Sequence, residues 1–157
     1  MNDNKNFMLE AVRQSFDTMR SGEGGPFGAV IVKDDKIIAR GGNSVSTLND
    51  PTAHAEIVAI REACKALNTF QLNGCDIYTS CEPCPMCLGA IYWARIDKIY
   101  FGNTKKDAAK IDFDDEFIYQ ELDLPLTERN LPIEQICRDE AIKAFEEWEN
   151  KPDKIKY

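Results

Sequence analysis

Residues 76–93 read DIYTSCEPCPMCLGAIYW, and this stretch decides the fold. An Asn-Gly pair breaks the chain shortly before it, which predicts that Asp76–Ser80 form a strand. Pro85 suits the first position of a helix, so we expect a helix from Pro85 through Trp93. Because that helix is apolar nearly all round, it is predicted to be buried. A strand that leads into a buried helix is typical of α/β proteins.

The chain on both sides of this stretch alternates in the same way. A first helix with an apolar stripe is predicted to end near residue 21, its stripe made of Met8, Val12, Phe16 and Met19. Next we expect a hairpin with strands at 27–32 and 37–39, a loop at 44–50, and a helix capped by Thr52 with apolar positions Ile57, Ile60, Cys64 and Leu67. A fourth strand is expected at 97–101, and helices at 116–122 and 139–149. Strands that alternate with helices predict a mixed or parallel sheet covered on both faces.

Length and composition indicate an ordinary globular protein. The chain has 157 residues, 43% hydrophobic and 29% charged, which is most simply one domain spanning 1–157. No apolar run reaches the roughly 18 residues of a membrane span. The first five residues lack the order of basic and apolar residues that marks a signal peptide. These features predict a cytoplasmic protein that does not contact membranes.

The net charge of −8 is unevenly distributed. Residues 107–149 hold 14 acidic and 4 basic residues, a net charge of −10, and the rest of the chain is +2. Enzymes that bind nucleic acids usually display a basic surface, because neutralised phosphates dominate their affinity. The charge therefore favours a small neutral substrate and excludes a nucleic acid polymer as the expected partner.

Two short motifs supply the chemistry. His54-Ala55-Glu56 and Pro83-Cys84-Pro85-Met86-Cys87 together offer one imidazole, two thiolates and one carboxylate. Three soft ligands (His54, Cys84 and Cys87) suit Zn²⁺, and a set of three leaves a position open for water. The remaining carboxylate, that of Glu56, can then carry a proton to or from that water. Six cysteines in a chain with a full core and no export signal favour thiols and a metal over a disulfide framework.

A closed structural zinc site is the main alternative. Cys81, Cys84, Cys87 and His54 would make a Cys₃His site with no open position. That arrangement would leave Glu56 without a role beside the metal, and a thiol cluster without metal explains less still. His54 is the only histidine, so sites that need two imidazoles are excluded.

The chain resembles the cytidine deaminase superfamily and, within it, the small bacterial guanine deaminases. The H-x-E and P-C-x-x-C motifs are the signature of zinc deaminases that act on nucleobases. The resemblance runs from about residue 7 to residue 157 and rests on the segments 25–29, 49–56, 79–87, 89–95 and 113–115. The metal motifs also occur in tRNA adenosine deaminases, whereas segments 91–95 and 113–115 are more specific.

The resemblance implies a three-layer α/β/α fold, with a mixed sheet and one Zn²⁺ per subunit. It also implies a reaction, the hydrolysis of guanine to xanthine and ammonia. Zinc lowers the pKa of a bound water toward about 7. Glu56 takes the proton of the water and passes it to a ring nitrogen, and the water oxygen adds to C2. Ammonia then leaves.

The resemblance further implies substrate-contacting residues, each with a plain structural alternative. Asn43 would bind a base edge, or only cap a turn. Asp115 would move a proton to the leaving amine, or be one more charge on an acidic surface. Phe27 and Trp93 would sandwich the base, or belong to the core. Tyr157 would close the site, or end a frayed tail.

The expected assembly is a homodimer in which a segment of about 130–157 is swapped between subunits and covers the partner's site. The alternatives in function are a guanosine deaminase, a tRNA adenosine deaminase and a non-catalytic zinc-stabilised binding protein. The acidic surface argues against the second, and Glu56 argues against the third.

Overall fold

The computed structural model describes residues 3–157, which divide into two compact units, Met1–Glu116 and Phe117–Tyr157. Each unit is described by itself. The elements in order are α1 Asp3–Ser21, β1 Gly28–Lys33, β2 Lys36–Gly42, α2 Val45–Leu48, α3 Ala55–Leu67, β3 Cys75–Cys81, α4 Pro85–Trp93, β4 Lys98–Asn103, α5 Lys105–Ala109, α6 Glu116–Asp123, the 3₁₀ helix η1 Leu126–Glu128 and α7 Arg138–Asn150.

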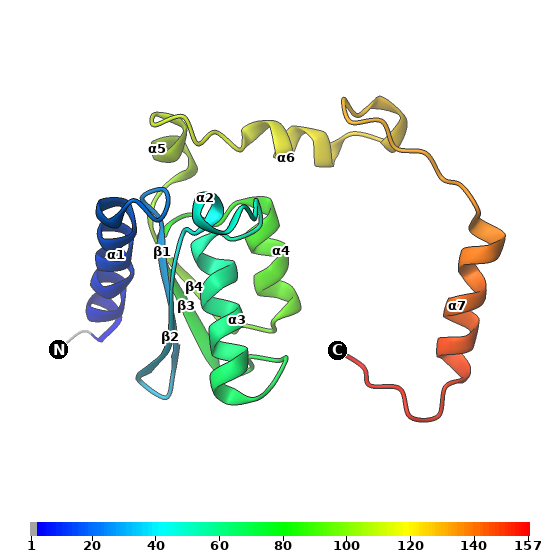
Figure 1. Cartoon of the computed structure of the whole chain (residues 1–157), viewed down its shortest axis with the longest axis horizontal. Helices are drawn as coiled ribbons and strands as arrows, with labels where there is room; N and C mark the ends of the chain where they lie inside the picture. Colours follow the sequence, from blue (N-terminus) through cyan, green and yellow to red (C-terminus); the bar gives the residue numbers. More distant parts are fainter. Residues whose placement is uncertain (1–2) are drawn as a thin grey trace. The chain divides into compact units, whose positions relative to one another are not determined.

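The first unit is built on one four-stranded sheet with the order β2-β1-β3-β4. Strand β1 pairs antiparallel with both β2 and β3, and β3 pairs parallel with β4, so the sheet is mixed. Helix α1 covers one face, and α3 and α4 cover the other (Figure 1). The predicted three-layer α/β/α fold is confirmed, and all four expected strands are present within two residues of their expected starts.

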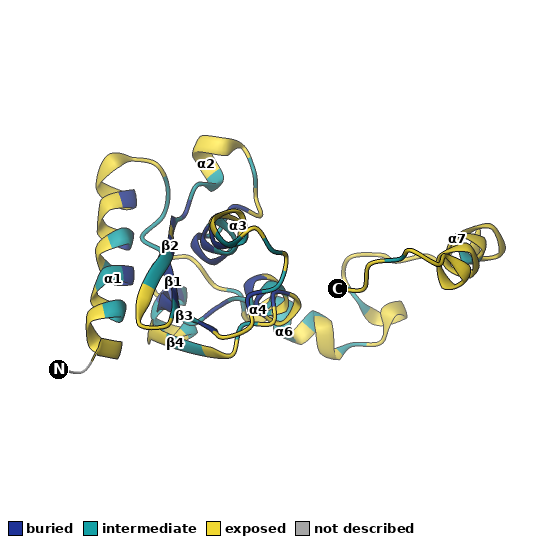
Figure 2. Cartoon of the chain, turned by 90° about the horizontal axis from the view of Figure 1, so that it is seen from below, coloured by how far each residue is buried: buried dark blue, intermediate teal, exposed yellow. Residues whose placement is uncertain are grey.

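Small residues bring the helices close to the sheet. A Cβ on Gly28 would collide with the backbone of α1 at Ala11 and Ser15, and a Cβ on Gly41 would collide with the backbone of α3 at Ala55. Only a glycine strand surface allows such close approach. The core between the sheet and α3 and α4 is accordingly rich in alanine beside Ile31, Ile77 and Ile91. Figure 2 shows buried segments in dark blue on the sheet and on α3 and α4.

This close approach corrects the predicted stripe of α1. The buried residues of the helix are Ala11, Ser15 and Thr18, which are small enough to face the sheet. Of the residues in the apolar stripe, Met8 packs against the core, whereas Phe16 and Met19 are each 44% exposed. The apolar spacing correctly predicted the helix, but residue size decides which face meets a glycine-containing sheet.

Three other local expectations were wrong. The expected loop at 44–50 contains the one-turn helix α2. Helix α3 is capped by His54, not by Thr52, whose carbonyl instead accepts a turn hydrogen bond from the His54 N–H. Helix α4 is not buried on all sides: Cys87 and Ile91 are buried, whereas Tyr92 and Trp93 are exposed.

The second unit has a different character. The predicted helices at 116–122 and 139–149 are present as α6 and α7. No residue between 117 and 157 is buried, and Phe145 is 74% exposed on α7 (Figure 2). None of the helices formed by residues 3–157 combines the length and apolarity that crossing a membrane requires.

Candidate active site

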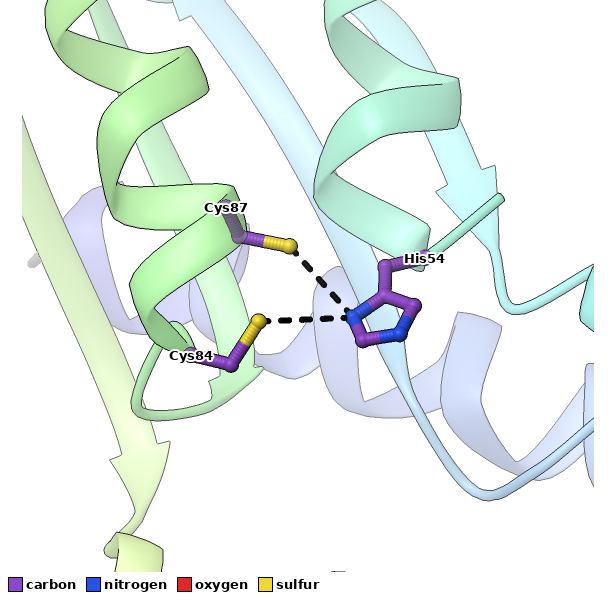
Figure 3. Close-up of side chains that lie close together, drawn as sticks. All are labelled: His54, Cys84 and Cys87. Atoms are coloured by element: carbon purple, nitrogen blue, oxygen red, sulfur yellow. Dashed lines mark hydrogen bonds between the residues drawn. The ribbon is translucent and has the colours of Figure 1, made fainter. Parts of the chain in front are cut away.

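Two helix starts carry the predicted metal ligands. His54 caps α3, Cys84 caps α4, and Cys87 lies in the first turn of α4. The Sγ atoms of Cys84 and Cys87 lie 3.6 and 3.5 Å from His54 Nδ1 (Figure 3). Within residues 3–157 these three side chains form a group that could hold a metal ion, with ligand atoms within 4.8 Å of one another. The structure therefore brings together the three ligands named from the sequence.

The donor set fits a zinc ion. Bonds of about 2.3 Å to sulfur and about 2.0–2.1 Å to nitrogen, arranged tetrahedrally, place sulfur and nitrogen ligands about 3.6 Å apart. A hydrogen bond from Cys87, supported by His54, lowers the pKa of Cys84 to about 4. The same contact with Cys84, together with burial, raises the pKa of Cys87. Two thiols that compete for one negative charge mark a place where a cation would let both become thiolates.

Glu56 lies in the first turn of α3 and is buried against this group. Burial is the main cause that raises the pKa of its carboxyl, and the thiolate of Cys84 acts in the same direction. The carboxyl also lies within hydrogen-bonding reach of the Cys87 thiol. A buried carboxyl with a raised pKa beside a metal-ligand set is suited to accept and donate a proton.

Cys81 is not part of the metal-ligand group. Its Sγ instead lies 3.7 Å from the carbonyl oxygen of Thr104, at the junction of β4 and α5. Burial is the main cause that raises the pKa of this thiol to about 11. The structure thus gathers three ligands without Cys81, and this grouping argues against the closed Cys₃His alternative.

Residues 82–84 join β3 to α4 and form the metal-ligand loop. Asn43 and Phe27 lie at the same edge of the sheet as this loop. Asn43 directly follows β2, Phe27 directly precedes β1, and the Asn43 N–H donates to the Phe27 carbonyl at 3.1 Å. Asn43 Oδ1 accepts from the N–H groups of Gly25 and Val45, at 3.4 and 3.3 Å, so the turn-capping role exists. Because Oδ1 accepts hydrogen bonds from two backbone N–H groups, the amide nitrogen is the part of this side chain that can donate a hydrogen bond to a ligand. Phe27 packs edge-on against Phe113, with ring centroids 4.9 Å apart.

Asp115 is turned partly inward, whereas its neighbours Asp114 and Glu116 are exposed. Burial is the main cause that raises the pKa of Asp115, followed by the Cys84 thiolate. The Lys105 ammonium acts in the opposite direction. The substrate-facing role of Asp115 stays a prediction.

Trp93 does not lie in this group, and Tyr157 belongs to the other unit. Trp93 ends α4 at the opposite end from Cys84, about 13 Å along the helix axis, and is 65% exposed. Tyr157 is 70% exposed and belongs to the second unit. A role for Trp93 in a sandwich with Phe27 would need a second subunit.

Sequence reasoning missed helix α5 and the residues that anchor it. The Lys105 N–H, at the start of α5, donates to Glu82 Oε2 at 3.0 Å, and Glu82 lies two residues before Cys84. Thr104 and Asp107 form a reciprocal capping box. The pattern Thr-x-x-Asp is a recognisable sign of a helix start, so this signal was present in the sequence.

Three protein ligands with an open fourth position, a buried carboxylate and an α/β/α scaffold define a mononuclear zinc hydrolase. Residues 1–103 match the family described as the cytidine and deoxycytidylate deaminase zinc-binding region. The chain belongs to this family, which confirms the family resemblance and the zinc cofactor.

Individual members of the family differ in how similar they are to this chain. The chain is 52% identical to guanine deaminase of Bacillus subtilis over 155 residues, which covers 99% of both chains. The crystal structure of that enzyme superposes with a TM-score of 0.95 over 98% of both chains. Guanine deaminase of Nitrosomonas europaea is 31% identical with a TM-score of 0.66, covering 69% of this chain and 63% of that one. The tRNA-specific adenosine deaminase of Aquifex aeolicus is 38% identical over 92% of this chain and 93% of its own length.

Proposed function

We propose that the chain is a zinc-dependent guanine deaminase that converts guanine and water to xanthine and ammonia. The observation that carries the proposal is the group of His54, Cys84 and Cys87 with the buried Glu56 beside it. The choice of guanine is supported by the 52% identity over nearly the whole chain, against 38% for the tRNA enzyme.

In this proposal each residue has a stated task. When bound by His54, Cys84 and Cys87, zinc acts as a Lewis acid toward water. Glu56 takes a proton from that water and delivers it to a ring nitrogen, and the water oxygen adds to C2 of the base. Asp115 moves a proton to the departing amine, which leaves as ammonia.

The remaining site residues would hold the base. The amide nitrogen of Asn43 can donate to an acceptor on the edge of guanine, because its oxygen is held by Gly25 and Val45. Phe27 can cover one face of the ring, supported from the side by Phe113. Trp93 and Tyr157 remain in the proposal as residues that a second subunit would contribute.

We also propose that the enzyme is a homodimer in which a segment of about 130–157 is exchanged. A 41-residue unit without a buried residue gains little that could offset the entropy lost on ordering it, so it needs a surface to cover it. The first unit offers apolar surface of its own. One part is the exposed end of α4, and another is a hollow of about 510 Å³ lined by Phe16 and Met19 of α1 and by Ile111, which follows α5.

A cytoplasmic location and a small-molecule substrate without a nucleic acid partner complete the proposal. All six cysteines are free, in keeping with a reducing compartment. The net charge of −10 in residues 107–149 opposes binding to a polyanion.

Ammonia release is the test of the proposed function. Zinc-loaded protein is offered guanine, guanosine, adenine, cytosine and cytidine separately. Guanine should be the best of the five, and tRNA should not bind at physiological salt. Efficient turnover of guanosine without guanine would assign the chain to nucleoside deaminases, and absence of turnover with all five would reject the proposal.

A further inference from the structure

The segment that carries Asp115 is connected to the metal-ligand loop through α5 and Glu82. Glu82 lies between the end of β3 and Cys84, and its N–H donates to the Asn103 carbonyl at 2.8 Å. Its carboxylate accepts from the N–H of Lys105 at 3.0 Å. Because the backbone and the side chain of Glu82 both hold this junction, the start of α5 has a fixed position relative to the metal-ligand loop.

The side chain of Lys105 extends this connection by a further step. Its Nζ lies 2.9 Å from Glu116 Oε2, across 11 positions of sequence, and Glu116 directly follows Asp115. The Lys105 side chain is 31% exposed, whereas that of Lys110, which pairs with Asp107 on the same helix at 3.0 Å, is 74% exposed. The two ion pairs therefore differ. The pair of Lys105 and Glu116 joins separate segments, whereas the pair of Lys110 and Asp107 is a local contact on the surface of α5 and its C-cap.

Phe113 and Glu116 make the other contacts described for the Asp115 segment, residues 112–116, on the first unit. The Phe113 N–H donates to the Ala108 carbonyl, and the Phe113 ring contacts Phe27. The Glu116 N–H donates to Asp114 Oδ1, which is a bond within the segment. Lys105 also acts electrostatically on Asp115 itself, lowering a pKa that burial raises. The Lys105 ammonium group thus contacts Glu116, the residue after Asp115, and it also lowers the pKa of Asp115 itself.

We propose that Lys105 is a positioning residue that holds the Asp115 carboxylate toward the substrate by bridging Glu82 and Glu116. Its backbone N–H is fixed by Glu82, and its ammonium group fixes the residue after Asp115. This inference rests on the proposed function, since it assigns Lys105 a part in the proton transfer to the leaving amine. Asn43 and Phe27, which are proposed to hold the base, are not members of the bridge, although the Phe113 ring of the same segment packs against Phe27.

The test compares Lys105→Met with Lys105→Arg and with the matched control Lys110→Met, all as full-length zinc-loaded protein. Methionine keeps an unbranched side chain, one atom shorter than that of lysine, and removes the charge. We expect Lys105→Met to lower kcat about tenfold with KM within about threefold of wild type, because proton transfer acts in the transition state. Lys105→Arg should restore kcat to within about threefold, and Lys110→Met should change it less than twofold, since exposed pairs contribute little.

Two further measurements keep the test decisive. Glu116→Gln breaks the same bridge at an exposed position and should lower kcat, and adding Lys105→Met to it should lower kcat by less than the product of the two single effects. Hydrogen exchange of backbone amides in residues 112–116 should be faster in Lys105→Met than in Lys110→Met at equal zinc content.

The outcomes separate this inference from the proposed function. If wild type deaminates guanine and Lys105→Met keeps its kcat, or if exchange in residues 112–116 is the same in both variants, Lys105 has no positioning role. If wild type deaminates none of the bases, the proposed function fails, while hydrogen exchange still decides whether Lys105 holds the segment.

Discussion

Residues 3–116 and residues 117–157 differ in how far they bury their apolar side chains. In the first unit, helices pack on both faces of a sheet, and the whole side chains of Ile31, Ile77 and Leu72 are buried. In the second unit no residue is buried, although α6 and α7 carry large apolar side chains such as Phe117 and Phe145. The metal-ligand group, Glu56 and Asp115 all belong to the first unit, so the chemistry and the exposed apolar helices are separated along the chain.

This difference shows what each unit can do alone. The first unit buries its own core and holds the metal-ligand group, Glu56 and Asp115, so these reactive groups depend on contacts within one chain. The second unit needs a surface to cover it, so its contribution is expected to depend on assembly. Variants in the first unit should therefore abolish chemistry, and variants in the second should affect closure and oligomeric state.

The largest expected effect is the loss of the metal. Cys84→Ser should leave the protein without zinc and without activity, because a hydroxyl does not replace a thiolate ligand. Cys81→Ser is the matched control, since Cys81 contacts Thr104 and lies outside the ligand group. Zinc content by elemental analysis and X-ray absorption measure the outcome. A spectrum with three sulfur ligands in wild type would restore the closed structural site.

Glu56→Gln should retain zinc and fold but lose turnover by about 10²–10⁴-fold, the usual contribution of a positioned acid-base group. Glutamine keeps the shape of the buried side chain and cannot carry the proton. Glu62→Gln on the exposed face of the same helix is the control and should keep wild-type kinetics. A Glu56→Gln enzyme with nearly full activity would contradict the proton-transfer role.

Removing the last three residues tests whether the second unit contributes to the site. Removal of Ile155, Lys156 and Tyr157 should lower kcat/KM at least tenfold, about 1.4 kcal/mol, without unfolding the first unit. Asp153→Ala, an exposed substitution in the same tail, should have no such effect. Light scattering should report a dimer. A truncated enzyme with unchanged kinetics, or a fully active monomer, would remove the second unit from the site.

The sequence was most informative where chemistry and geometry coincide. Pro85 and the Cys84 and Cys87 pair fixed the start of α4, and His54 was correctly named as their partner because soft ligands at helix starts meet at one sheet edge. The apolar spacing correctly predicted the helix α1, but periodicity does not include the size limit set by Gly28, so it did not point to Ala11 and Ser15 as residues that face the sheet. Trp93 and Tyr157 could not be placed because apolar spacing does not say which chain covers an exposed helix.

The smallest expected effect tests how the first unit holds its own layers. Glu10 on α1 contacts Arg40 on β2 at 2.6 Å and Arg13 on its own helix, also at 2.6 Å. The hydrogen bond with Arg13 is the largest cause that lowers the pKa of Glu10 from 4.5 to about 2, with Arg40 contributing. A carboxyl whose pKa is lower in the folded state stabilises that state above the unfolded pKa, and this stabilisation is lost as pH falls toward the folded pKa.

Glu10→Gln should therefore lower the free energy of unfolding by about 1 kcal/mol or less at pH 7, in line with other exposed pairs. The difference from wild type should remain constant down to about pH 5 and shrink between pH 4.5 and 2. Urea unfolding of both proteins over this pH range measures it, with Glu62→Gln on α3 as a control for an ion pair that joins no two layers. A difference that stays constant to pH 3 would show that Glu10 acts through packing and not through its charge.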